Sequence, residues 1–567
     1  MEDLEDAAKL LRVALDHYLD VCLKIHSLVA RKGTLRNIPQ KFLRHINTEM
    51  DRFPSYEHKL RQAGAAVCRV RNRLPRLAPV ILLPPEILTR IFQFVASPCD
   101  ILRTPDDEDS ESETPESPSE VSDAGVSVEG PRSKALQLKN FPSHLDRVTH
   151  VCSSWRWIAI GTPSLWTHID FIPNRSLHRK LLARAETYAT RAARLSIELH
   201  VADDDPPTYN WVKLRQFLSS ILHRIKLLDI VMIHRWCRFH TSILDELFPH
   251  PAPESTVLTK LTGSFPMADD ELDEFIDWLD DANESLFRLT VLHLHGIFPL
   301  WDSTAYYNLV DLRLIAPCDA RWTCISESQL QSMLAASPGL RIFYFALQII
   351  DRKPDEESVT PVRLNDLQVL HISTNRGMED TILRPGNVLR LLAPGSTPLR
   401  VSIWHRHCAS TGENTRFYCE YDEFSLDELV KFFQRSNITK FCAKDICPRL
   451  DKLLCHTSNL EDLVLDYSVS IWKGMTPFQR DGPATFHLNS LILHDCTPNL
   501  EQLELLLQQY PTNLLVASNC NWSEITINDE RDCVAQLHRL LMHYPNTRLV
   551  VNEGQLSDPI ASWDLID

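Results

Sequence analysis

Residues 289–294 read Leu-Thr-Val-Leu-His-Leu, with leucine at the first, fourth and sixth positions. Residues 309–314, Leu-Val-Asp-Leu-Arg-Leu, repeat this spacing. Alternating apolar and polar side chains at the end of each stretch predict a β-strand with one buried face. Equivalent triplets are Ile225, Leu228 and Ile230; Leu340, Phe343 and Phe345; Leu367, Leu370 and Ile372; Leu460, Leu463 and Leu465; and Leu488, Leu491 and Leu493.

The triplets recur at intervals of about 20 to 35 residues where the series is unbroken, which is the spacing of leucine-rich repeats or slightly longer. Helical patterns lie between them, at residues 326–340, 425–434 and 500–511. The first two begin with serine closely followed by an acid, which is typical of a helix N-terminus. We therefore predict an α/β solenoid of about ten irregular, leucine-rich-repeat-like units over residues 190–555, with the recurring leucines in its core. A folded α/β domain without repeat symmetry is the alternative, because no asparagine or cysteine recurs at a fixed ladder position.

Residues 1–75 carry a helical pattern ahead of the solenoid. Apolar or nearly apolar side chains alternate there at three and four positions, which is a heptad seam. The members of this seam are Leu4, Ala8, Leu11, Leu15, Tyr18, Cys22, Ile25 and Val29. A second helical stretch covers residues 38–70, with an expected break at Pro54. We predict a helical hairpin or coiled coil that either props the next domain or self-associates through residues 4–29.

Composition restricts the classes of function. Fifteen glycines among 567 residues fall well below the usual share of about 7%, which disfavours the glycine-rich loops of nucleotide-binding enzymes. A formal net charge of −16 disfavours nucleic acid or an anionic membrane as the main partner. No apolar run approaches the roughly 18 residues of a membrane helix, and the cysteines are scattered singly. We expect a soluble protein of the cytoplasm, the nucleus or both.

Much of the negative charge lies in one insert. Residues 100–131 contain eleven acidic residues and one arginine, mixed with serine and proline. This composition predicts a disordered segment at about residues 100–135. The segment is either a tolerated surface insertion or a tether tuned by phosphorylation, because acidic residues flank Ser110 and Ser112.

Two short motifs flank the insert. Residues 83–92 read Leu-Pro-Pro-Glu-Ile-Leu-Thr-Arg-Ile-Phe, in which the prolines and the glutamate suit the first turn of a helix. Residues 151–159, Val-Cys-Ser-Ser-Trp-Arg-Trp-Ile-Ala, have helical spacing and precede Thr-Pro-Ser-Leu-Trp at 162–166. Taken in this order, the motifs resemble the F-box, most closely the form found in F-box proteins of mushroom-lineage fungi. An all-α F-box-like domain is therefore expected over residues 81–170, interrupted by the insert.

The resemblance implies binding to a Skp-type adaptor, which joins F-box proteins to a cullin and a RING ubiquitin ligase. It also implies that the leucine-rich repeats recruit a target protein. The family pattern assigns the adaptor contacts to Leu83, Pro84, Glu86, Ile87, Leu88, Ile91, Phe92, Val151, Cys152 and Trp155. Phe92 is also expected to contribute to the core. A three-helix unit of this size cannot bury all of these apolar residues, and an apolar patch left over would form an interface.

No catalytic motif accompanies these features, so we expect neither enzyme activity nor a cofactor. Zinc-ligand residue types occur at His405, His407, Cys408 and Cys419, and at Cys442, Cys447 and Cys455, but no Cys-x-x-Cys pair is present. We therefore expect no metal site. The sequence predicts a substrate-receptor subunit of an SCF-type ubiquitin ligase with an unidentified protein target. The alternative is an interaction scaffold that binds an adaptor without promoting ubiquitin transfer.

Overall fold

The computed structural model of the chain describes residues 2–31, 39–71, 80, 83–95, 144–171, 178–203, 212–232, 246–247, 257–264, 288–296, 298–316, 324–351, 359–375, 385–406, 426–444, 450–466, 487–496, 500–520, 537–552, 560 and 563. The chain divides into two compact units, one of Met1–Ile91 and Val148–Ile158 and the other of Phe92–Arg147 and Ala159–Asp567. The predicted acidic insert at about 100–135 lies outside the described residues. No helix within those ranges combines the length and apolarity needed to cross a bilayer.

Two long helices form a hairpin in the first unit: α1 (Glu2–Arg31) and α2 (Gln40–Arg71). The Tyr18 hydroxyl donates to Glu49 Oε2 at 3.2 Å, and its ring lies 6.2 Å from that of Phe53. None of the described side chains of α2 is buried. The expected break at Pro54 is wrong, because α2 continues through it. A proline inside a helix removes one backbone donor and crowds the preceding turn, which can kink a helix without ending it.

Three short helices carry the F-box-like motifs: α3 (Pro85–Val95), α4 (His144–Val151) and α5 (Ser153–Ile160). α3 begins where the Pro84 carbonyl accepts hydrogen bonds from the amides of Ile87 at 3.0 Å and Leu88 at 3.1 Å. A proline costs no hydrogen bond at this point, since the first amides of a helix have no partner within it. The Cys152 carbonyl, between α4 and α5, accepts from the amide of Arg156 at 3.0 Å.

The second unit is built on one sheet of fourteen strands in the order β1-β2-β3-β4-β5-β6-β8-β11-β13-β14-β15-β16-β17-β18, and every neighbouring pair is parallel. These strands are β1 (His168–Phe171), β2 (Ile197–Asp203), β3 (Ile225–Met232), β4 (Lys260–Ser264), β5 (Val291–His295), β6 (Asp311–Ile315), β8 (Ile342–Ala346), β11 (Val369–Asn375), β13 (Leu399–Arg406), β14 (Ile438–Lys444), β15 (Asp462–Asp466), β16 (Leu488–His494), β17 (Thr512–Ser518) and β18 (Arg548–Asn552). Two small parallel pairs join β7 (Cys324–Ser326) to β9 (Gln348–Ile350) and β10 (Val362–Leu364) to β12 (Leu392–Pro394).

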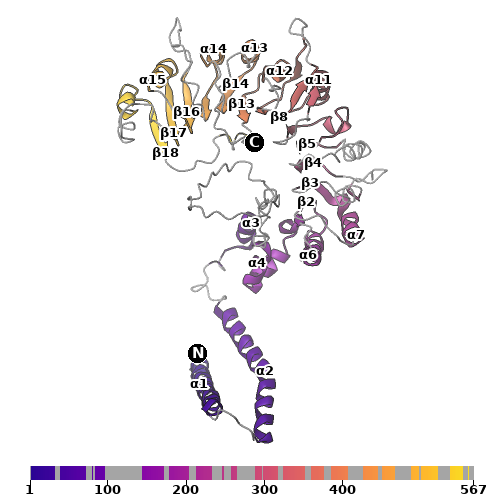
Figure 1. Cartoon of the computed structure of the whole chain (residues 1–567), viewed down its shortest axis with the longest axis vertical. Helices are drawn as coiled ribbons and strands as arrows, with labels where there is room; N and C mark the ends of the chain where they lie inside the picture. Colours follow the sequence, from indigo (N-terminus) through magenta and orange to yellow (C-terminus); the bar gives the residue numbers. More distant parts are fainter. Residues whose placement is uncertain are drawn as a thin grey trace, which may run out of the picture. The chain divides into compact units, whose positions relative to one another are not determined.

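Helices and 3₁₀ turns connect the strands along one side of the sheet (Figure 1). They are η4 (Pro163–Trp166), α6 (His178–Arg191), α7 (Val212–Ile221), η5 (Leu222–Arg224), η6 (Thr304–Tyr306), α11 (Glu327–Ala336), α12 (Pro385–Leu389), α13 (Leu426–Arg435), α14 (Leu450–Leu453), η8 (Leu454–His456) and α15 (Leu500–Gln509). The architecture is a leucine-rich-repeat-like solenoid that follows N-terminal helices.

The leucine triplets form the core, as predicted. All seven triplets, from Ile225 to Leu493, are buried. The second and third members of each triplet are two residues apart in the strand. They lie on the same face, because side chains alternate along a strand. The sheet extends further than expected, however. β1 pairs with β2, so the first strand lies within the segment assigned to the F-box-like domain and well before residue 190. Fourteen strands also exceed the expected ten or so units.

Candidate functional site

The first candidate surface is an apolar face of α3. Leu83, Ile87 and Ile91 are all exposed, with 49% of Ile87 accessible to solvent. Pro84 and Glu86 are exposed as well. Ile87 and Ile91 are four residues apart and share one stripe of α3, and Leu83 lies two residues before its first residue, Pro85. This stripe is available for a partner.

Two of the predicted adaptor contacts are not on this surface. Leu88 and Phe92 are buried, at 2% and 0% exposure. They too are four residues apart, but each directly follows Ile87 or Ile91 and is turned by about 100° from it around α3. The family-derived assignment of Leu88 and Phe92 to adaptor contact therefore disagrees with their placement, whereas the expectation that Phe92 contributes to the core is confirmed.

The second motif contributes Val151, which is exposed, and Cys152 and Trp155, which are half-buried. These three residues belong to the same compact unit as Leu83–Ile91. The Arg156 Nε donates to the Thr149 carbonyl at 2.7 Å, which ties the start of α5 to the end of α4. The described structure thus places eight of the ten predicted contacts at least partly in reach of solvent.

Sequence reasoning missed two strongly exposed aromatic residues. Phe94 on α3 is 70% exposed and lies one residue before position 95, where the four-residue spacing of Ile87 and Ile91 would continue. Trp157 on α5 is 76% exposed. The signal for Phe94 was its distance of seven residues from Ile87, which returns to nearly the same helical direction. Large exposed aromatic side chains are characteristic of interaction surfaces.

The second candidate surface is the sheet face opposite the leucine core. One row of side chains on this face crosses the sheet, one residue from each strand, in register. The row is mostly polar over the first nine strands and apolar over the last five. Over the first nine strands its members are Asp170, His200, Asp229, Thr262, His293, Arg313, Tyr344, His371 and Ser402. Over the last five they are Cys442, Val464, Ile492, Val516 and Val550. The polar part of the row presents charged and aromatic groups that can bind a partner. The apolar part is stabilised when other side chains cover it and shield it from water.

That cover comes from the C-terminal end of the chain. Trp563 is buried against Cys442 and Val464, with Ile492 and Ile560 packed beside them. The guanidinium of Arg400 donates to the main-chain carbonyl of Trp563. The segment is therefore held by a polar anchor as well as by apolar contact.

The polar part of the row contains networks of histidine and carboxylate. His293 Nε2 lies 2.8 Å from Asp311 Oδ2, which also contacts the Arg313 guanidinium at 3.0 Å. Burial lowers the pKa of His293 despite the Asp311 charge. Burial raises the pKa of Asp311, but His293 and Arg313 outweigh it, so the pKa is lowered. Asp311 and Arg313 are therefore an ion pair within the sheet face, with His293 beside them.

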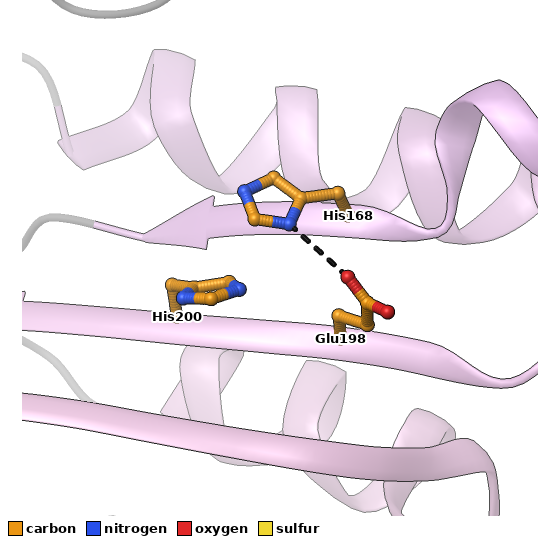
Figure 2. Close-up of side chains that lie close together, drawn as sticks. All are labelled: His168, Glu198 and His200. Carbon is orange, nitrogen blue, oxygen red and sulfur yellow. Dashed lines mark ion pairs between the residues drawn. The ribbon is translucent and has the colours of Figure 1, made fainter. Parts of the chain in front are cut away.

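A denser cluster lies at the first two strands (Figure 2). His168 on β1 faces Glu198 on β2, its register partner, and His200 lies two residues further along β2. His168 Nε2 is 2.9 Å from Asp170 Oδ1, and its Nδ1 is 3.5 Å from Glu198 Oε2. Burial lowers the pKa of His168, but the neighbouring carboxylates of Asp170 and Glu198 outweigh it and raise the pKa to about 9.

The zinc-ligand types noted in the sequence do not form this cluster. Cys442 is buried in the apolar part of the row, whereas Cys455 is exposed on η8. His407, Cys408, Cys419 and Cys447 lie outside the described residues, and so does the side chain of His405. Sequence spacing could not have identified His168, Glu198 and His200, because β-pairing joins residues about 30 positions apart.

Comparison with known proteins adds little to this geometry. No protein-family model matches the chain, and no curated protein matches it. The crystal structure of an internalin (inlF) from Listeria monocytogenes is similar over 67% of this chain and 94% of that chain, with 16% sequence identity and a TM-score of 0.27. The strand pairing of this chain itself shows a leucine-rich-repeat-like parallel sheet.

Proposed function

We propose that the chain is the substrate-receptor subunit of an SCF-type ubiquitin ligase, acting in the cytoplasm, the nucleus or both. In this role the F-box-like helices bind a Skp-type adaptor and the solenoid binds a target protein. The chain performs no bond chemistry itself. It holds a target lysine close to a ubiquitin-charged enzyme that the other subunits bring, which raises the effective concentration of the reacting groups.

The observation that carries the proposal is the exposed apolar surface formed by Leu83, just before α3, and by Ile87 and Ile91 on α3. The motif that resembles the F-box assigns these residues to the adaptor, and they are exposed although Leu88 and Phe92 on the neighbouring stripe of α3 are buried. An apolar stripe exposed on one helix is costly unless a partner covers it. Val151 is a further exposed apolar residue of the same compact unit.

The target-binding half of the proposal draws on the polar row of the sheet. Arg313, Tyr344 and His371 are half-buried neighbours there, with the Arg313 guanidinium 4.5 Å from the Tyr344 ring. Arginine and tyrosine side chains held in fixed positions are common anchors of protein interfaces. This row is therefore the surface on which we place target recognition.

The test is co-purification of the full chain with a Skp-type adaptor. We expect the wild type to retain the adaptor and the double variant Ile87→Asp with Ile91→Asp to lose it, since each buried interface anchor contributes about 2 kcal/mol or more. Met542→Asp is the matched control, because Met542 is 84% exposed and belongs to the solenoid unit. Failure of the wild type to bind any Skp-type adaptor would refute the proposal.

A second measurement separates the receptor from a non-catalytic scaffold. The purified complex of chain and adaptor is mixed with a cullin and RING subunit, and assembly is followed by size-exclusion chromatography. A receptor enters the larger complex. If the adaptor binds the chain but the cullin is excluded, the scaffold is the correct function.

A further inference from the structure

We propose that His168, Glu198 and His200 bind a Zn²⁺ ion on the polar face of the first two strands. The three side chains project from β1 and β2 toward the same space (Figure 2). One ligand atom from each lies within 4.8 Å of the other two. The inference does not depend on the proposed ligase function, because it rests on this donor set alone.

Each imidazole lies beside an aspartate, and His200 is hydrogen-bonded to its own. Asp170 Oδ1 lies 2.9 Å from His168 Nε2, and Asp229 Oδ2 lies 3.1 Å from His200 Nδ1. A carboxylate that accepts from one imidazole nitrogen fixes the tautomer and leaves the other nitrogen as a metal ligand. At His200 the nitrogen left over is Nε2, which is buried and makes no hydrogen bond within the described part of the chain. Both ring nitrogens of His168 are also buried without a hydrogen bond there, and Nδ1 is the one that faces Glu198.

The spacing of the donors suits a tetrahedral ion. His168 Nδ1 and Glu198 Oε2 are 3.5 Å apart. Two ligands of a tetrahedral Zn²⁺ with bonds of about 2.0 to 2.1 Å lie about 3.3 Å apart, so this pair needs only a small adjustment. Two imidazole nitrogens favour zinc over calcium or magnesium, which prefer oxygen ligands.

The site would be open on one side. The Glu198 side chain is 47% exposed, whereas the His168 and His200 side chains are mostly covered, at 14% and 12% exposure. Three protein ligands leave the fourth position of a tetrahedral ion for water. The ion would also bridge β1 to β2 at the edge of the sheet, since His168 comes from one strand and the other two ligands from its neighbour.

The test measures binding of Zn²⁺ to the full chain by competition with a zinc-sensitive chelator dye. We expect Glu198→Gln and His200→Asn each to lower the affinity of this site about a hundredfold or more, and Asp229→Asn to lower it about ten- to a hundredfold. His223→Asn is the matched control, because His223 is exposed on η5. Unchanged affinity in both Glu198→Gln and His200→Asn would overturn the proposal.

Thiolates are the main competing ligands, since the chain has fifteen cysteines. Co²⁺ substitution separates the two kinds of site. A tetrahedral site of two histidines and a glutamate gives visible absorption without thiolate charge-transfer bands in the near ultraviolet. We expect Glu198→Gln to remove this visible signal while thermal unfolding of the metal-free variant stays like that of the wild type. A signal that carries thiolate bands and persists in Glu198→Gln would place the metal elsewhere and refute the site.

Discussion

Glu327 and Arg390 form a buried ion pair inside the solenoid. Arg390 Nε donates to Glu327 Oε1 at 2.6 Å, and the two side chains are only 6% and 2% exposed. Glu327 is the first residue of α11, and Arg390 directly follows α12. The pair therefore links two consecutive units where an unpaired charge would be poorly solvated.

Replacing one member of this pair should be far more damaging than replacing both. We expect Glu327→Gln to lower the free energy of unfolding by about 3 to 5 kcal/mol, because it leaves the Arg390 charge buried without its partner. The double variant Glu327→Leu with Arg390→Met should lose less than the sum of the single changes. Urea denaturation followed by circular dichroism measures these differences. A cost below about 1 kcal/mol for the single variant would contradict the burial argument.

A second residue-scale prediction concerns His494 on β16. Its Nδ1 lies 2.8 Å from Asp466 Oδ1 on β15, and this hydrogen bond raises the pKa of His494 above its ordinary value of 6.5. Asp495 adds to the rise, whereas burial and Lys444 on β14 oppose it. Ser518 on β17 is the register neighbour on the other side.

Because the pKa of His494 is raised in the folded protein, protonation of His494 stabilises the fold. A histidine with a raised pKa in the folded state stabilises the fold fully below pH 6.5, and the contribution disappears as the pH rises through the folded-state pKa. We expect Asp466→Asn to lower the His494 pKa in an NMR titration of labelled histidine, with the signal assigned through His494→Asn. A titration midpoint unchanged by Asp466→Asn would show that the pairing has no effect in solution.

At the scale of elements, local signals at helix starts agree well with the structure. Ser326 was predicted as a helix start, and its side chain accepts from the Gln329 amide at 3.2 Å in a full capping box. Hydrogen bonds at a cap involve residues three positions apart, so the sequence carries the necessary information. The expected break at Pro54 is the exception, because α2 continues through this residue. Whether a proline ends a long helix depends on the whole helix and its contacts, and not on the proline alone.

Within a single chain, several leucines of the heptad seam of α1 are left exposed to solvent. Leu4, Leu11 and Leu15 are 55%, 46% and 45% exposed even with α2 folded alongside. We expect the seam to pair with a second copy, since exposed leucines at heptad spacing are buried by coiled-coil association. Light scattering coupled to size-exclusion chromatography should give a dimer mass for the wild type and a monomer mass for Leu11→Asp with Leu15→Asp.

A matched control uses leucine and valine outside the seam. Leu10 and Val13 are exposed on α1 and do not belong to the heptad positions. The variant Leu10→Asp with Val13→Asp introduces the same charge into the same helix, and we expect it to remain dimeric. A wild-type chain of monomer mass would exclude self-association through residues 4–29.

At the scale of the whole solenoid unit, the C-terminal end closes the apolar part of the sheet face. Arg400 and Trp563 are 163 residues apart in sequence, yet the guanidinium of the first holds the carbonyl of the second. Trp563 is 6% exposed and packs on Cys442 and Val464. The indole therefore protects an apolar surface that would otherwise face water.

Removing the indole should expose Cys442. We expect Trp563→Ala to make Cys442, 1% exposed in the intact protein, reactive toward a thiol reagent, as read by mass spectrometry of the modified peptides. Cys455 is exposed in the described structure and provides an internal reference for reactivity. Trp563→Phe should keep most of the protection. Equal protection of Cys442 in the wild type and in Trp563→Ala would show that the tail does not cover this surface.

The sequence alone determined the repeating strand, the helix starts and the apolar character of α3. These features depend on residues within a few positions of each other, and the triplets from Ile225 to Leu493 are all in the core as expected. The sequence also predicted most of the exposed apolar surface and a core role for Phe92, but not that Leu88 turns inward. Which side of an amphipathic helix is covered depends on what packs against it, and that information is not local.

Only the tertiary structure decided the polar row and its clusters. His168 and Glu198 become neighbours because β1 and β2 pair in one register, although they are 30 residues apart. A shift of one residue would send either side chain to the opposite face, and the connecting segments between strands vary in length. The cover supplied by Trp563 depends in the same way on a contact that spans the last third of the chain. Such long-range pairings arise from the packing of the whole sheet, which no short stretch of sequence encodes.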